Sequence, residues 1–245
     1  GKAELNVYDV QQERYGEMRP AQQVMIFVTE DFSRQKQVKL DYPAQAGADR
    51  LPVLKLNAIR RFQTGIYDYS LMTSVFSPLD GSPAVKSTVT VQDWCGHVFT
   101  QLNKAETGYI AQGFSYFESE GDSAFVLNDA DYLESDFWTR IRLGPQKIQN
   151  GTYRIILSAI FSRFRHKPLK TETAEVSISD SPDNPETQNL MIQYRSTSRK
   201  LEITFEKNFP FRITAWNEWN NSKLMSAGKL RQTQRRAYWQ HNRIE

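Results

Sequence analysis

Three side chains that could form a nucleophilic site lie close together in the sequence: Asp93, Cys95 and His97. A cysteine nucleophile needs a histidine base and an orienting carboxylate. Residues two apart on an extended strand share one face, so these three would lie side by side. The alternative is structural: Cys95 packs as a small residue, Gly96 allows a bend, and His97 lies at the surface. We favour this alternative, because adjacency along a strand is not the geometry of a catalytic triad.

The candidate metal ligands are too few or wrongly spaced. Asp93 and His97 supply two ligands, whereas a transition metal needs three or four. An acidic stretch downstream could bind calcium or act as paired carboxylates, but it fits neither an EF-hand loop nor a glycosidase signature. A solvated loop followed by a helix cap explains it better; its residues are Glu118, Glu120, Asp122, Asn128, Asp129 and Asp131. No metal and no cofactor is expected, and we find no glycine-rich nucleotide loop.

A set of aromatic residues is the remaining candidate site. On a sheet, such residues either form ordinary core or line an apolar ligand groove, and core is the default interpretation. The set consists of Tyr67, Tyr69, Trp94, Phe99, Tyr116 and Trp138.

Composition limits the classes of function. The 245 residues include 31 basic and 28 acidic side chains, a net charge of only +3, so the overall charge does not indicate a nucleic-acid-binding protein. The single cysteine excludes an intrachain disulfide framework. No apolar run is long enough to predict a membrane-spanning helix. The 14 Phe and 11 Tyr favour a β-rich protein.

One helix is predicted over residues 131–143. Leu133, Phe137, Trp138 and Ile141 fall on one helical face, which would cover a sheet. Asp131 with Glu134 predicts a capping box at its start, and Gly144-Pro145 ends it.

Nearly everything else shows the period-2 alternation of strands. The segment after the helix alternates clearly, with Tyr153, Ile155, Leu157, Ala159 and Phe161 on one face, and so do Val38, Leu40 and Tyr42. We expect ten to twelve strands with short antiparallel connections. The predicted fold is all-β: a curved antiparallel sheet forming a half-barrel or open barrel, with one main helix. Residues 1–228 would form a single β domain and residues 229–245 a basic C-terminal tail.

The predicted tail combines Trp239 with five basic residues: Lys229, Arg231, Arg235, Arg236 and Arg243. Such a segment could lie on nucleic acid or on an anionic membrane surface. A solvated terminus is the simpler interpretation, and we expect no nucleic-acid partner.

The order of elements resembles a known group of proteins. Long meandering strands precede Asp136-Phe-Trp-Thr-Arg-Ile-Arg-Leu-Gly144, and the chain closes with Leu201-Glu-Ile-Thr-Phe-Glu206 and Phe209-Pro-Phe-Arg-Ile213. This arrangement resembles uncharacterised exported bacterial proteins, a family of unknown function predicted to be periplasmic or lipid-anchored. The fold of that family is similar to the half-barrel of the lipoprotein-localisation factor. The resemblance implies a location in the periplasm or at the outer membrane, and it supplies no catalytic residues.

The first residue, Gly1, bears on the same expectation. A chain without an initiating Met suggests that an export signal or a lipid-attachment cysteine has been removed upstream. An ordinary internal domain boundary is the alternative.

We therefore expect an exported, non-enzymatic envelope protein that holds a lipid or another apolar ligand in a concave sheet. The removed N-terminal segment would anchor it to the membrane. The ligand would contact six residues: Tyr67, Tyr69, Tyr116, Phe137, Trp138 and Ile141. The alternative hypothesis is a hydrolase that uses Asp93, Cys95 and His97.

Overall fold

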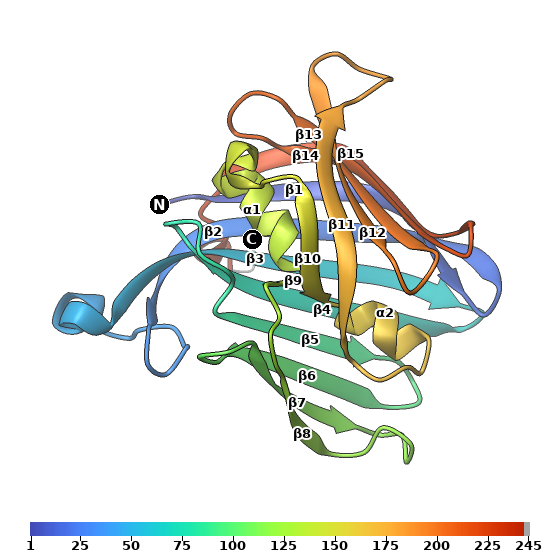
Figure 1. The fold of residues 1–245 in the computed structure, drawn as a ribbon, viewed down its shortest axis with the longest axis horizontal. Helices are drawn as coiled ribbons and strands as arrows, with labels where there is room; N and C mark the ends of the chain where they lie inside the picture. The colour runs from blue at the N-terminus through green and yellow to red at the C-terminus, as the bar shows by residue number, and fades with distance from the viewer. Residues whose placement is uncertain (243–245) are drawn as a thin grey trace.

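The computed structural model describes residues 1–242 and arranges them as one curved β-sheet around two short α-helices (Figure 1). Within these residues the sheet has 15 strands, in the spatial order β8-β7-β6-β5-β4-β3-β2-β1-β15-β14-β13-β12-β11-β10-β9. Neighbouring strands are antiparallel except β9 and β10, which are parallel. The predicted fold class, a curved antiparallel sheet that stays open, is confirmed.

The first half of the sheet is a meander of hairpins. Its strands are β1 (Ala3–Arg14), β2 (Glu17–Ser33), β3 (Arg50–Thr64), β4 (Tyr67–Pro78), β5 (Lys86–Gln92), β6 (His97–Lys104), β7 (Tyr109–Ser115) and β8 (Ser123–Leu127). Between β1 and β2, Tyr15 and Gly16 have φ angles of 57° and 86°, as a tight two-residue hairpin turn requires. Because hairpins alternate in direction, the turns after β1, β3, β5 and β7 all lie at one end of the sheet.

The second half contains both helices and returns to β1. Its elements are β9 (Tyr132–Leu133), α1 (Asp136–Leu143), β10 (Gly151–Ile156), α2 (Ala159–Phe164), β11 (Thr171–Asp180), β12 (Thr187–Tyr194), β13 (Arg199–Glu206), β14 (Ile213–Asn220) and β15 (Lys223–Arg236). Strand β15 pairs with β1, which joins the two halves into one sheet. Within residues 1–242, short 3-10 turns cover Pro43–Gln45, Gly47–Asp49, Pro145–Lys147 and Tyr238–Gln240.

The main core lies inside the curve of the sheet. Phe137 and Ile141 of α1 are fully buried there, against residues from both halves, such as Leu56 and Ile203. Their spacing of four puts them on one helical face, as predicted. Among the described residues, no helix combines the length and apolar character needed to cross a bilayer.

The predicted helix of residues 131–143 is shorter than expected. Residues 132–133 form β9, and the helix begins only at Asp136. The prediction of a capping box is wrong, because the Asp131 and Glu134 side chains both have other partners. The Asp131 carboxylate accepts the backbone N–H of Arg154 at 2.7 Å, and Glu134 binds Arg199.

The strand predicted through Phe161 ends at Ile156, and the chain then forms α2. The Ser158 hydroxyl caps this helix by accepting the backbone N–H of Phe161 at 3.3 Å. A serine at the N-cap satisfies an amide that has no partner inside the helix. The prediction of one main helix therefore missed a second.

Three other boundaries also differ from the predictions. Residues 38–42 form no strand beyond a single bridge between Phe32 and Lys39. Strand β8 occupies part of the predicted acidic loop. The basic segment from Lys229 to Arg236 is paired in β15, so the tail does not begin at residue 229. The predicted tail residue Arg243 and the last two residues lie outside the described part of the chain.

Candidate functional site

Residues of α2 border two cavities of different size inside the curve of the sheet. The smaller one, which we call the inner cavity, has a volume of about 80 Å³. The larger one, which we call the groove, has a volume of about 330 Å³. Ile160 lines the inner cavity, whereas Ser162 and Arg163 line the groove.

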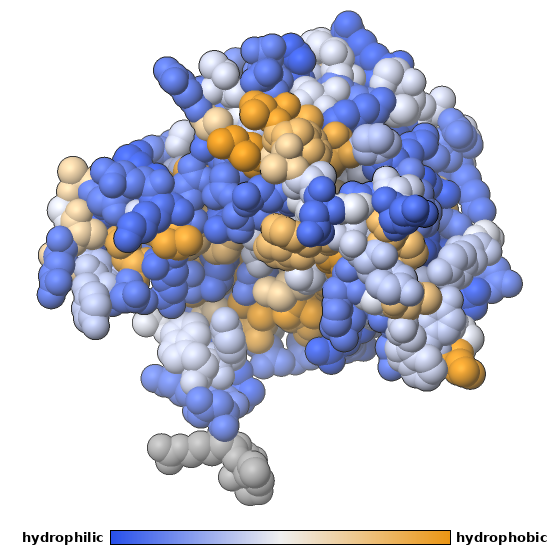
Figure 2. All heavy atoms as spheres, turned by 90° about the horizontal axis from the view of Figure 1, so that it is seen from below, coloured by the Kyte–Doolittle hydropathy of each residue, from blue (hydrophilic) through white to orange (hydrophobic). Residues whose placement is uncertain are grey.

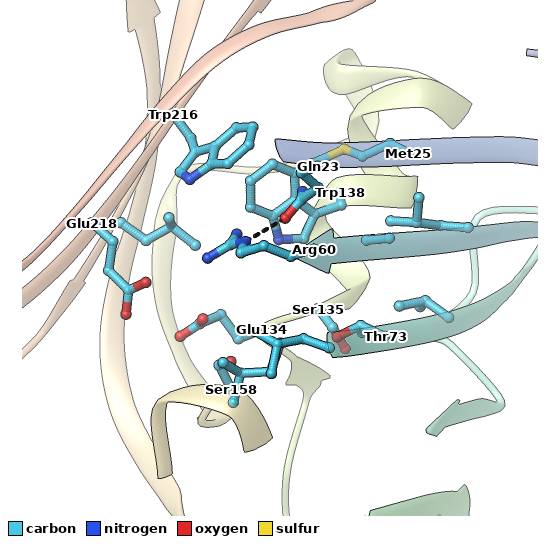
Figure 3. Close-up of a pocket in the computed structure, with 16 residues that line it drawn as sticks. Gln23, Met25, Arg60, Thr73, Glu134, Ser135, Trp138, Ser158, Trp216 and Glu218 are labelled. Carbon is cyan, nitrogen blue, oxygen red and sulfur yellow. Dashed lines mark hydrogen bonds between the residues drawn. The ribbon is translucent and has the colours of Figure 1, made fainter. Parts of the chain in front are cut away.

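The inner cavity has a mostly apolar wall formed by β2, β3, β4, α1, β13 and β14 (Figure 3). Trp138 of α1 and Trp216 of β14 meet there edge to face, with ring centroids 5.5 Å apart. Aromatic pairs prefer this geometry. A volume of this size accommodates water or a very small ligand and is below the range of drug-sized ligand pockets, about 300–1,000 Å³.

One cation, Arg60, projects into the inner cavity (Figure 3). Its Nε donates to Gln23 Oε1 at 2.7 Å and its Nη1 to Ser226 Oγ at 3.2 Å, with a further bond to Gln12 Oε1. Its guanidinium also lies 5.6 Å from the Trp216 ring centroid. Burial lowers the pKa of Arg60 to about 10, although the Glu218 carboxylate opposes this effect. Arg60 is therefore still charged at neutral pH.

A buried ion cluster forms another side of the inner cavity. Arg199 binds Glu134 through two hydrogen bonds, one of them 2.7 Å long, and Glu218 through its Nη2 at 2.8 Å. The Tyr194 hydroxyl also donates to Glu134. Burial disfavours charge on Arg199, but the Glu134 and Glu218 carboxylates outweigh it and raise the pKa of Arg199 well above its usual value. This cluster holds together β13, β14 and the residues just before α1.

The groove lies between α2 and the concave face of β6, β7 and β8. Its floor consists of side chains that alternate along these strands, and it includes Val98, Thr100, Ala111 and Phe125. Its roof is α2 with the segment that follows, down to Leu169. The volume falls at the lower end of the range of ligand-binding pockets.

Basic side chains gather at the mouth of the groove. Glu120 Oε1 accepts from Arg163 Nη1 at 3.0 Å and lies 2.9 Å from His166 Nδ1. The Arg163 guanidinium also stacks 4.1 Å above the Phe117 ring. Lys167 lines the groove and forms no ion pair with the residues that the structure describes. The groove thus combines an apolar floor with an ammonium group at its opening.

The six predicted ligand contacts occupy four separate places. Trp138 lines the inner cavity, while Phe137 and Ile141 are core residues with no exposed surface. Tyr67 and Tyr69 belong to an aromatic cluster at the hairpin end of the sheet, with ring centroids 5.9 Å apart.

Tyr116 is 65% exposed, in the turn after β7. None of the six lines the groove. Sequence reasoning missed the groove residues, although the basic segment of residues 163–168 was a signal for its mouth.

Of the proposed catalytic residues, Asp93 and Cys95 lie in the turn between β5 and β6, and His97 is the first residue of β6. Asp93 Oδ1 accepts the backbone N–H of Cys95 at 2.7 Å and of Gly96 at 3.3 Å, so the carboxylate stabilises the turn. Cys95 and His97 are exposed, and no hydrogen bond in the described chain joins them. The acidic stretch is likewise structural at Glu120 and Asp131, and the described residues contain no group of three or more potential metal ligands.

Comparisons with known proteins support the fold alone. No protein-family model matches the chain, and no curated protein matches it. The chain is similar to a crystal structure described as a beta-barrel-like protein of domain of unknown function DUF1849 from Brucella abortus. The TM-score is 0.55 at 9% sequence identity, over 96% of this chain and 98% of that chain. This chain therefore shares the fold of an uncharacterised beta-barrel-like protein, and the comparison gives no likeness to the lipoprotein-localisation factor.

Proposed function

We propose that this protein is a non-enzymatic binding protein that holds an amphiphile in the groove, with its apolar chain on the floor and its acidic head group at the mouth. The observation that carries the proposal is the combination of a 330 Å³ apolar-floored groove with Lys167 at its opening. An apolar chain on this floor removes hydrophobic surface from water, and a carboxylate head group offers the ammonium a partner.

The space inside the groove and its access from outside support ligand binding. Its floor strands carry small residues, Ala111 and Gly113, which leave room above the sheet. The roof helix α2 follows Ser158 and is joined to β11 by an exposed segment, so a ligand can enter from the side of Lys167 and Pro168.

Decanoate and decanol are suitable probes, because they share a chain and differ in head group. Calorimetric titration is expected to show saturable binding of both, with decanoate tighter. Lys167→Ala should weaken decanoate and leave decanol unchanged. Octanoate should bind more weakly than decanoate, by about 0.8 kcal/mol for each methylene that no longer enters the groove.

A pair of adjacent substitutions tests the location. Thr100→Phe places a ring on the groove floor, whereas Gln101→Phe places the same ring on the opposite face of β6, because successive strand residues point to opposite faces. The first variant should lose at least tenfold in decanoate affinity and the second should bind normally. Equal binding by the two variants, or no binding of either probe by the wild type, would rule out the groove as the site.

The proposal includes an exported location, which rests on the family resemblance. It is tested separately by fractionating bacteria that express the full gene product. Recovery in the periplasmic or membrane fraction supports export, and recovery with cytoplasmic markers removes this part while leaving the binding proposal intact.

A further inference from the structure

One edge of the sheet is open, and the other is covered along half of its β10 strand. Strand β8 is the last strand in the order, and among the described strands it pairs with β7 alone (Figure 1). At the opposite edge, the two residues of β9 pair with Ile155 and Ile156 of β10, and Asp131 pairs with Arg154. Its backbone N–H donates to Arg154 O at 2.8 Å, and its carboxylate accepts the Arg154 N–H. Among the described residues, the outer edge of β8 has no backbone partner.

The open edge lacks the features that normally prevent strand pairing. Its sequence, Ser123-Ala-Phe-Val-Leu127, contains no charged residue and no proline, which soluble proteins commonly place on edge strands. Val126 is 54% exposed and Phe125 is 38% exposed. An exposed, uncharged edge of this kind is a template for another strand.

The outer face beside this edge is also apolar. Ile110 of β7 lies directly opposite Val126 and is 45% exposed, and Phe114 of the same strand is 50% exposed. Seen from the β8 side, the surface carries hydrophobic groups among hydrophilic ones (Figure 2). These exposed apolar side chains add surface that a partner strand at this edge would cover.

The sequence of β8 is complementary to itself. If two copies pair antiparallel around Phe125, that residue faces its own copy, Ala124 faces Val126, and Ser123 faces Leu127. Just beyond the strand, Asp122 falls opposite Asn128, so no two like charges oppose one another. This register pairs all five residues of the strand and gives a two-fold interface in which both copies use the same surface.

We propose that β8 pairs with β8 of a second copy of this chain, so that one sheet continues through a two-fold axis at Phe125. Because Phe125 also lines the groove, the pairing brings the grooves of the two copies next to each other. The dimer does not depend on any ligand in the groove.

Sedimentation velocity of the full chain over a range of concentrations tests the proposal. The wild type should sediment as a concentration-dependent dimer. Val126→Lys puts a charge on the paired edge and should shift the equilibrium to monomer. Ile66→Lys, at an 82% exposed residue in the turn between β3 and β4, is the matched control and should remain dimeric.

Disulfide trapping tests the register. In a Cys95→Ser background, Phe125→Cys should form a cross-linked dimer on mild oxidation, because this residue faces its own copy. Ala124→Cys faces Val126 and should cross-link much more slowly. A monomer at every concentration, which is also the result expected if β8 recruits a strand of another protein, would overturn the proposal. Equal cross-linking of the two cysteine variants would overturn the register.

Discussion

Arg199 on β13 and Glu134, two residues before α1, form a buried ion pair with two hydrogen bonds across 65 residues of sequence. The Arg199 side chain is 1% exposed and that of Glu134 is 4% exposed. Both charged groups have lost their water, so the pair is favourable only because their hydrogen bonds are well aligned. The pair links Glu134, which lines the inner cavity, to strand β13.

Arg199→Met should therefore destabilise the fold severely. It leaves Glu134 and Glu218 without their shared cation, and breaking a buried pair from one side costs about 3–5 kcal/mol. Urea denaturation measures the free energy of unfolding. Arg195→Met is the control, because Arg195 pairs with Glu175 at a 58% exposed side chain and should matter far less. The double variant Arg199→Met with Glu134→Gln should recover part of the loss, and a loss no greater than that of Arg195→Met would contradict the role assigned to the pair.

A second ion pair makes the stability depend on pH. The Arg142 guanidinium donates hydrogen bonds of 2.6 Å and 2.8 Å to the Glu4 carboxylate. Burial raises the pKa of Glu4, but the hydrogen bond and charge of Arg142 outweigh burial, so this pKa lies below its usual 4.5. Because the folded state has the lower pKa, ionised Glu4 stabilises the protein above pH 4.5, and this contribution is lost as the pH falls through the folded-state pKa.

Glu4→Gln should therefore be less stable than the wild type at neutral pH, with the difference shrinking in acid. Denaturation curves recorded at several pH values below neutrality measure this difference. Two stability profiles that stay parallel down to the acid limit would show that Arg142 does not hold the Glu4 carboxylate as the structure indicates.

Ser158 should stabilise the roof of the groove. Removing its cap with Ser158→Ala is expected to cost about 1 kcal/mol, the usual loss for an N-cap serine. Ser179→Ala, on an exposed position of β11, is the control and should change the free energy of unfolding little. Chemical denaturation compares the two, and equal losses would mean that the 3.3 Å contact from Phe161 to Ser158 does not cap α2.

The sequence patterns predicted correctly those features that depend on residues close together in the chain. Phe137 and Ile141 are in the core because a spacing of four puts them on one helical face. Glu134 shows the limit, because three-residue spacing from Asp131 indicates a cap, while its partner Arg199 lies far along the chain. Only the tertiary fold brings that partner near.

The groove escaped prediction for a related reason. Its floor follows strand alternation that is visible in the sequence, as at Val98 and Thr100. The helix that forms its roof was not predicted, because the apolar alternation of the preceding strand continues through Ala159 and Phe161, which belong to α2. Short apolar runs fit either structure, and here the Ser158 cap and tertiary packing decided. Whether Tyr67, Tyr69 or Tyr116 contacts a ligand stays a prediction.

Gly228 of β15 should be intolerant of any side chain, because the Trp216 ring occupies the space that a Cβ would need. The two residues are direct partners across β14 and β15, and a Cβ at residue 228 would come within 2.1 Å of the Trp216 ring. Trp216 is 2% exposed and is held by Tyr8 and Trp138, so its ring cannot swing away. Gly228→Ala should therefore cost about 1–3 kcal/mol, as overpacking of a tight core does.

The matched control is Gly151→Ala at the start of β10, where the added Cβ meets only ordinary contacts, the nearest at 3.7 Å. Urea denaturation should separate the two variants, with Gly151→Ala close to the wild type. Tryptophan emission adds a second readout, since a displaced Trp216 no longer packs against Trp138 and Arg60 at the inner cavity. If Gly228→Ala is as stable as Gly151→Ala and its emission is unchanged, the close packing of Trp216 on β15 is not what fixes the wall of the inner cavity.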